Sequence, residues 1–238
     1  MQEIPRISVI IPCFNHADIL RRTLEGLSSQ TLKPLEVIVV NDGSSDDPSV
    51  AVREAAQKLP ITFISLKSNK GAPYARNLGA TTAGGDFFMF LDADAILQPT
   101  ALQLLHGALS QNPDAVFSYS NFFWGAKRFK AKPFDVAALK NNNFIHTSSM
   151  IRRCAFPGFD EKLARFQDWD LWLTIAKRGG VGVWIDKELF RVEPRSAGIS
   201  RWLPRVMYWI PWQWLGFIPK EISKYRDAEA IVRKKHGI

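Results

Sequence analysis

Two aspartates, Asp92 and Asp94, follow the apolar run at residues 87–91 and are separated by one residue. If the backbone is extended at this point, the two carboxylates face the same side of the chain. Paired carboxylate oxygens suit a hard cation such as Mn²⁺ or Mg²⁺, which keeps coordination positions for substrate phosphates. A strand-ending turn in which the aspartates accept backbone N–H groups explains the same spacing. The spacing alone leaves both alternatives open.

The elements that would position these aspartates alternate between strands and helices. Buried strands are predicted by apolar, β-branched-rich runs at residues 7–11, 35–40, 61–64 and 87–91. Helices are predicted by amphipathic spacing and start signals at residues 17–29, 48–58, 73–80, 100–109, 170–177 and 219–236. Such alternation predicts an α/β fold in which helices flank a mainly parallel sheet.

Polar residues stand where the predicted strands end. Asn15 follows the first strand, Asp42 follows the second, and Asp92 and Asp94 follow the last. Ligands of parallel sheets bind beyond the carboxyl ends of the strands. We therefore expect these side chains to share one binding site.

The order of these segments resembles the family 2 glycosyltransferases, which share the GT-A fold. The similar segments are residues 9–12 with Asn15, 39–46, 70–71 with 75–77, 90–94 and 167–172. They lie within residues 7–172, about two thirds of the chain. The resemblance implies an inverting hexosyl- or hexosaminyltransferase that moves a sugar from a nucleoside-diphosphate sugar to an acceptor hydroxyl.

The resemblance also implies roles on the nucleotide side. It places Pro12 and Asn15 at the nucleotide-sugar site. Asp42 would accept a hydrogen bond from the base, which favours uracil and hence a UDP-sugar. Arg76 would direct its guanidinium at base or phosphate oxygens. The alternatives are a turn-forming aspartate beside Gly43 and a solvated helix arginine.

On the reaction side, the resemblance implies that Asp94 binds the metal bridging the diphosphate and that Asp92 holds the ribose or a metal-bound water. It makes Asp168 the general base that takes the proton of the acceptor hydroxyl. Desolvation by Trp169 and its helix neighbours would raise the pKa of Asp168. As an alternative, Asp168 and Asp170 would be acidic residues stabilising a helix N-terminus, and we adopt that interpretation only for Asp170.

Two positions depart from the family pattern. The residue before the expected base is Gln167, where the family usually has an acid. Where many members carry a metal-binding histidine, this chain has Glu193, which is a possible oxygen ligand but fits a surface glutamate better. The four histidines, at 16, 106, 146 and 236, show no common metal-ligand spacing, so we expect ordinary polar or capping roles for them.

Charge and composition predict how the chain is organised. Of the net charge of +8, the last 38 residues carry +5, so a general nucleic-acid-binding surface is not expected. We expect a GT-A-like catalytic domain at 1–200, with a nucleotide-sugar-binding half at 1–114 and an acceptor half at 115–200. An aromatic and basic tail at 201–238 follows. The acceptor pocket is expected within 118–148, for a glycan or a lipid-linked acceptor.

Tryptophans, tyrosine and prolines crowd the first part of this tail. Residues 201–220 are therefore expected to touch a membrane surface, with packing against the core or a dimer contact as the alternative. No run of 18 apolar residues and no signal peptide is evident, and two cysteines do not form a disulfide framework. These features favour a cytoplasmic protein, peripheral at the inner face of the membrane.

Three other functions fit the sequence less well. A nucleotidyltransferase that makes sugar nucleotides would carry a Gly-rich, basic phosphate loop after the first strand, and residues 13–16 do not. A dinucleotide oxidoreductase would need a Gly-x-Gly-x-x-Gly motif there. A non-catalytic module that binds nucleotide sugars would keep the pocket without turnover, although Asp94 and Asp168 weigh against it.

Overall fold

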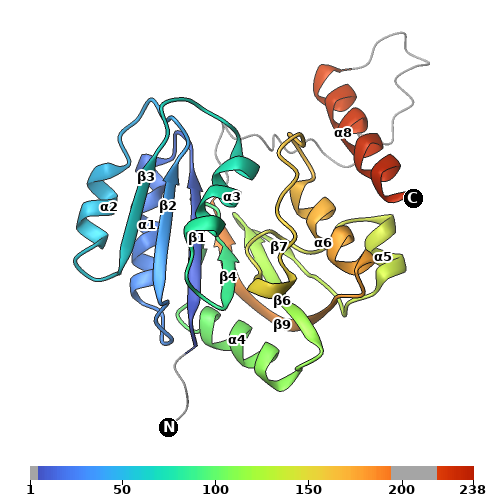
Figure 1. The fold of residues 1–238 in the computed structure, drawn as a ribbon, viewed down its shortest axis with the longest axis horizontal. Helices are drawn as coiled ribbons and strands as arrows, with labels where there is room; N and C mark the ends of the chain where they lie inside the picture. The colour runs from blue at the N-terminus through green and yellow to red at the C-terminus, as the bar shows by residue number, and fades with distance from the viewer. Residues whose placement is uncertain (1–4, 194–218) are drawn as a thin grey trace.

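The computed structural model describes residues 5–193 and 219–238, and in these residues nine strands form one mixed sheet. The strand order is β3-β2-β1-β4-β8-β6-β9-β5, and β7 pairs with β6. Figure 1 shows this sheet with helices on both of its faces. The aromatic stretch expected to contact a membrane lies outside the described residues, apart from Pro219 and Lys220.

The first half is parallel, as the sequence predicts. Its strands are β1 (Ile7–Cys13), β2 (Glu36–Asn41), β3 (Ile61–Ser65) and β4 (Phe87–Phe90), and β1 pairs with β2 and β4 while β2 pairs with β3. The intervening helices are α1 (Ala17–Ser28), α2 (Ser49–Ala55) and α3 (Ala72–Thr82). All seven predictions for this part of the chain are confirmed, with boundaries that differ by at most three residues.

The second half is mixed. Its strands are β5 (Ala95–Leu97), β6 (Ala115–Trp124), β7 (Lys127–Phe129), β8 (Met150–Arg152) and β9 (Val181–Val192). Strand β8 runs antiparallel to both β4 and β6, and β9 runs parallel to β6 with register shifts. Its helices are α4 (Ala101–Gln111), α5 (Val136–Asn141), the short 3₁₀ turn η1 (Arg153–Ala155) and α6 (Gln167–Lys177).

Two apolar cores lie on opposite faces of the sheet. On one face, leucines of α1 and α4 share a core with alternate residues of β1 and β2 such as Val9 and Val37, which are fully buried, and α4 lies against β6 and β9. On the other face, α3 packs against β1 and β2, where Ile10 and Ile38 are buried, and apolar residues of α6 belong to the same core. Burial on both faces explains why these strands are continuously apolar.

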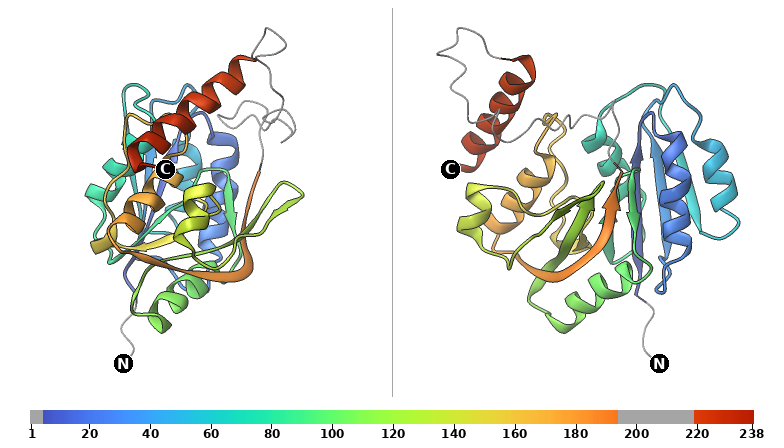
Figure 2. Two further views of the ribbon diagram at one scale, coloured as in Figure 1. Left: turned by 90° about the vertical axis from the view of Figure 1, so that its right-hand side faces the viewer. Right: turned by 180° about the vertical axis from the view of Figure 1, so that it is seen from behind.

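The last helix, α8 (Lys220–His236), lies against α6 at the end of the molecule remote from β3 (Figures 1 and 2). Its residues Ile222 and Val232 are fully buried. Gly237, with φ +67°, ends the helix in the left-handed conformation common after helix C-termini. Among the described helices, none is both long and apolar enough to cross a bilayer.

Candidate functional site

Two loops at the carboxyl ends of β1 and β2 are joined by Asn15. This residue has φ +55°, a left-handed conformation that asparagine tolerates better than most residues. Its side-chain oxygen accepts the Ser45 N–H at 2.8 Å and the Ser45 hydroxyl at 3.1 Å, and its own N–H donates to the Ser44 hydroxyl at 3.0 Å. Pro12 is the residue before the last of β1 and lies opposite Val40. Asn15 therefore fixes the two loops relative to each other.

Asp42, directly after β2, is a buried carboxylate rather than a local turn residue. It accepts the backbone N–H of Lys70 at 2.7 Å and that of Gly71 at 2.8 Å. Gly43 follows with φ +68°, and a Cβ there would lie 2.5 Å from the backbone carbon of Ser68. Each carboxylate oxygen can accept two hydrogen bonds, so this arrangement leaves acceptor capacity for a ligand.

Arg76, on α3, is the central cation of the site. Its Nη2 donates to Asp92 Oδ1 at 2.7 Å, and its Nη1 donates to Gln167 Oε1 at 2.7 Å. The guanidinium also lies 5.2 Å from the ring centroid of Phe159. Because its side chain is only 7% exposed, Arg76 is not a solvated surface arginine. It connects the end of β4 to the first turn of α6.

Asp92 and Asp94 stand in different surroundings. Burial alone would raise the pKa of Asp92, but the charges of Arg76 and His146 outweigh it, and the pKa lies below its ordinary value. The main-chain oxygen of Asp94 accepts the Glu193 N–H at 3.0 Å, directly beside the paired strands β5 and β9. The Glu193 carboxylate pairs with Arg22.

The donor set fits a divalent cation only in part. The carboxylate of Asp94 is of the hard-oxygen type that such a cation prefers, and backbone pairing brings the Glu193 position beside Asp94. Asp92 already accepts from a guanidinium, so its Oδ2 is the oxygen that would face a metal-bound water or a ribose. Across the described residues, no group of three or more His, Cys, Asp or Glu side chains is arranged to hold a metal.

His146, which the sequence assigns only an ordinary role, lies in the site. Its Nδ1 accepts the Ser148 N–H at 3.0 Å, so in the neutral ring Nε2 carries the proton. That Nε2 lies 3.8 Å from Asp92 Oδ2. Burial lowers the pKa of His146, although the charges of Asp92 and Asp168 oppose this. The only sequence signal for it was its place within residues 118–148.

Asp168 stands in the first turn of α6. Its Oδ2 accepts from the Asn143 side-chain amide at 2.8 Å, and its Oδ1 accepts the Trp169 N–H at 2.8 Å. Desolvation raises the pKa of Asp168, as expected, and the charge of His146 offsets part of this rise. The indole N–H groups of Trp169 and Trp172 donate to backbone oxygens at 2.7 and 3.0 Å, which anchor the helix.

The structure thus brings Arg76, Asp92, His146 and Asp168 into electrostatic contact with one another. Asn15 and Asp42 lie on the neighbouring strand ends. The arrangement offers a carboxylate of raised pKa, an imidazole of lowered pKa and a fixed cation near the carboxyl ends of parallel strands. It can take a proton from a hydroxyl group and hold negative charge nearby.

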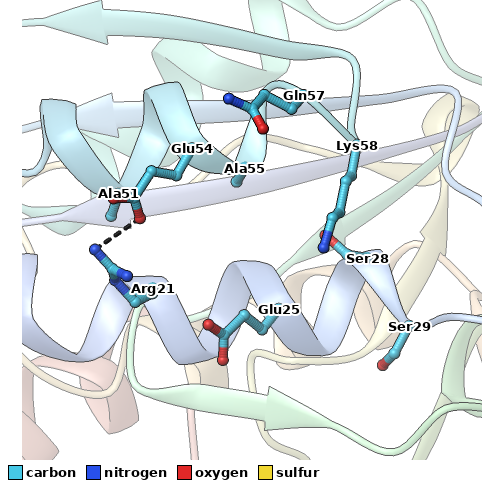
Figure 3. Close-up of a pocket in the computed structure, with 9 residues that line it drawn as sticks. All are labelled: Arg21, Glu25, Ser28, Ser29, Ala51, Glu54, Ala55, Gln57 and Lys58. Atoms are coloured by element: carbon cyan, nitrogen blue, oxygen red, sulfur yellow. Dashed lines mark ion pairs between the residues drawn. The ribbon is translucent and has the colours of Figure 1, made fainter.

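A groove of about 460 Å³ lies elsewhere, between α1 and α2 (Figure 3). Arg21 and Glu54 form an ion pair of 2.6 Å across it, and Glu25 and Lys58 line it further along. None of the expected site residues lines this groove. Its side chains are the outward-facing residues of two surface helices, and its charges are balanced.

Comparison with known proteins matches residues 8–166 to the model of glycosyl transferase family 2. An uncharacterized glycosyltransferase of Haemophilus influenzae is 35% identical over 113 residues, which is 48% of this chain and 37% of that protein. An uncharacterized glycosyltransferase of Rickettsia bellii is 29% identical over 207 residues, 80% of this chain and 29% of that protein. The chain therefore spans about a third of the length of these relatives.

Solved structures show the same fold. S. aureus TarS (residues 1–349), in complex with UDP-GlcNAc, has a TM-score of 0.73 at 19% identity, covering 92% of this chain and 69% of that one. Mannosyltransferase PcManGT from Pyrobaculum calidifontis, in complex with GDP-Man and Mn²⁺, has a TM-score of 0.69 at 20% identity, covering 98% and 71%. The predicted GT-A-like fold is confirmed, and the chain belongs to glycosyl transferase family 2.

Proposed function

We propose that this chain transfers a hexosyl or hexosaminyl group from a nucleoside-diphosphate sugar to an acceptor hydroxyl, with inversion at the anomeric carbon. The proposal rests on one observation. Asp168, whose pKa is raised, lies in electrostatic contact with Asp92 and the buried Arg76 near the carboxyl ends of parallel strands. Complexes of structural neighbours with UDP-GlcNAc and GDP-Man support the donor class.

Asp168 is the general base of this proposal. As the acceptor oxygen attacks the anomeric carbon, Asp168 takes its proton, because a carboxylate of raised pKa is the stronger base. Asn143 donates to one carboxylate oxygen and the Trp169 N–H to the other, so the carboxylate is oriented before substrate binds. The Nε2 of His146 lies 3.8 Å from Oδ2 of Asp92, and burial lowers the pKa of the imidazole.

The leaving nucleoside diphosphate requires charge stabilisation more than a proton. A Mn²⁺ or Mg²⁺ ion, when bound, would neutralise that charge. Asp94 would hold the ion, with Asp92 on a metal-bound water or on the ribose. Support for a metal is the Mn²⁺ in the PcManGT complex. Glu193 is engaged by Arg22, so we assign it to the surface rather than to the metal.

Asp42 is proposed to contact the base, which favours a UDP-sugar. The backbone N–H groups of Lys70 and Gly71 fix the orientation of the Asp42 carboxylate. The direction of its remaining lone pairs is therefore set by these two hydrogen bonds. Arg76 is committed to Asp92 and Gln167, so its part in donor binding is to fix those two groups.

The acceptor is proposed to be a glycan or a lipid-linked sugar, bound near residues 118–148. Residues 201–220 are proposed to contact a membrane surface, on the strength of their aromatic and basic composition. Flotation of the full chain with anionic liposomes at low salt tests this. Protein that stays at the bottom of the gradient would count against membrane contact.

A panel of UDP-, GDP- and dTDP-sugars, with and without Mn²⁺ or Mg²⁺, tests the main proposal. We expect metal-dependent release of nucleoside diphosphate from one UDP-sugar, and loss of that release in Asp168→Asn. A chain that binds the donor tightly but never releases nucleotide, with any acceptor tried, would be a binding module and not a transferase.

A further inference from the structure

Phe166, the residue before α6, has an unusual backbone conformation. Its φ of +60° and ψ of +28° place it in the left-handed region, which residues other than glycine rarely adopt. Such a conformation persists where surrounding contacts determine it. Phe166 turns the chain into α6, so that Gln167 reaches Arg76 and Asp168 enters the site.

The contacts that hold Phe166 come partly from the C-terminal helix. Its ring packs edge-to-face on Tyr225 of α8, with centroids 4.9 Å apart at 73°, and on Trp169 at 5.8 Å. Beside it, Arg165 forms an ion pair with Glu221, also of α8, at 2.7 Å. The chain segment immediately before the candidate base therefore rests on α8.

A second group of contacts lies immediately after the base. Asp170 is only 3% exposed, and two side chains of the last turn of α8 reach it. The Lys235 Nζ lies 2.8 Å from its Oδ1 and 2.9 Å from its Oδ2, and the His236 Nε2 lies 2.8 Å from its Oδ1. Lys235 also pairs with Asp160 at 2.7 Å, in the loop that leads to α6. A buried carboxylate without such partners is strongly unfavourable.

Helix α8 thus contacts Phe166, two residues before Asp168, and Asp170, two residues after it. We propose that α8 is a positioning element of the active site, and that Tyr225 and Lys235 are positioning residues that hold the carboxylate of Asp168 in its working orientation. The inference rests on the proposed function, because it assumes that Asp168 is the base. Figure 2 shows α8, in red, beside α6, in orange.

Positioning has a kinetic signature that distinguishes it from general stability. Displacement of a catalytic group by about 1 Å can lower the rate up to a hundredfold, even when substrate binding is intact. The α8 contacts described above fall on the base side of the site, whereas Asp42 and Asn15 lie on the β1 and β2 loops. Loosening α8 should therefore lower kcat and leave the donor KM and nucleotide Kd unchanged.

The test uses two matched pairs of variants in the full chain. Tyr225→Ala removes the ring that supports Phe166, while Tyr225→Phe keeps it. Lys235→Ala removes a cation from Asp170, while Lys234→Ala removes a neighbouring exposed cation. We expect Tyr225→Ala and Lys235→Ala to lower kcat by about tenfold or more at unchanged nucleotide Kd. Tyr225→Phe and Lys234→Ala should retain kcat near that of the parent chain.

Asp168→Asn, assayed in parallel, separates the two hypotheses. If Asp168→Asn loses turnover but Tyr225→Ala and Lys235→Ala keep the parent kcat at 25 °C, whatever their melting temperatures, the positioning inference is overturned and the base assignment stands. If Asp168→Asn keeps turnover, Asp168 is not the base, and the positioning inference that rests on this assignment fails with it. If Tyr225→Ala does not fold, Lys235→Ala decides the question. In that variant His236 still contacts Asp170, so we expect the chain to fold.

Discussion

The Nη2 of Arg76 donates to Oδ1 of Asp92 at 2.7 Å, and this ion pair distinguishes Asp92 from Asp94, two residues further along the chain. The Arg76 guanidinium holds the Asp92 side chain, and the main-chain oxygen of Asp94 accepts the Glu193 N–H beside β5 and β9. The two carboxylates should therefore respond differently to substitution, which makes their roles separable by experiment.

Arg76→Met should destabilise the fold by about 3 kcal/mol, because it leaves a largely buried carboxylate without its cation. The double variant with Asp92→Asn should recover part of that loss. Urea denaturation of the parent, both single variants and the double variant measures the coupling free energy. Strict additivity of the two single effects would show that the ion pair contributes nothing to stability.

Asp94→Ala should abolish metal-dependent donor binding and leave the fold intact, because Arg76 still holds Asp92. Asp47→Ala, at an exposed carboxylate on the α2 side of the β2 loop, is the control. Calorimetric titration with UDP in the presence of Mn²⁺ distinguishes the two. A normal titration of Asp94→Ala would remove Asp94 from the metal site.

Asp168→Asn should lower kcat on the order of a hundredfold or more, with donor affinity retained, because the amide cannot accept the proton. The pH profile gives a second criterion. The raised pKa of Asp168 means that its ionised form is lost as pH falls through that raised value. The acid limb of kcat should therefore lie above the ordinary titration range of an aspartate, and the residual activity of Asp168→Asn should lack this limb.

Gly43→Ala should destabilise the protein by about 1–3 kcal/mol and weaken nucleotide binding. The added Cβ would lie 2.5 Å from the backbone carbon of Ser68 at a φ of +68°, so the loop that holds Asp42 must shift. Gly107→Ala is the matched control, because a Cβ there meets nothing within 4 Å and the residue lies inside α4. It should stabilise the protein by up to about 1 kcal/mol. Equal melting temperatures for both variants would contradict the steric argument.

The local patterns of the first half were sufficient to predict its strands and helices. Continuous apolar runs that end at polar residues define β1, β2 and β4, and a polar cluster follows the end of each of these strands. Thr100 stands at the N-cap position of α4 as predicted, although its side chain makes no capping hydrogen bond.

The second half depends on contacts between distant residues, which no local pattern encodes. Strand β9 is half-exposed and pairs with β6 through several register shifts, so its alternation is irregular. Asn143 reaches the site through its hydrogen bond to Asp168 of α6, and His146 precedes β8, which pairs with β4. Likewise, Asp170 was expected to stabilise a helix terminus, and its partners on α8 are 65 and 66 residues away.

Asn15 joins the β1 and β2 loops through hydrogen bonds to Ser44 and Ser45 within the protein itself. The conformational entropy of these loops is therefore lost during folding, and not when a nucleotide arrives. Association should then proceed as a single bimolecular step, with an observed rate that rises linearly with nucleotide concentration and shows no plateau from a slow loop rearrangement.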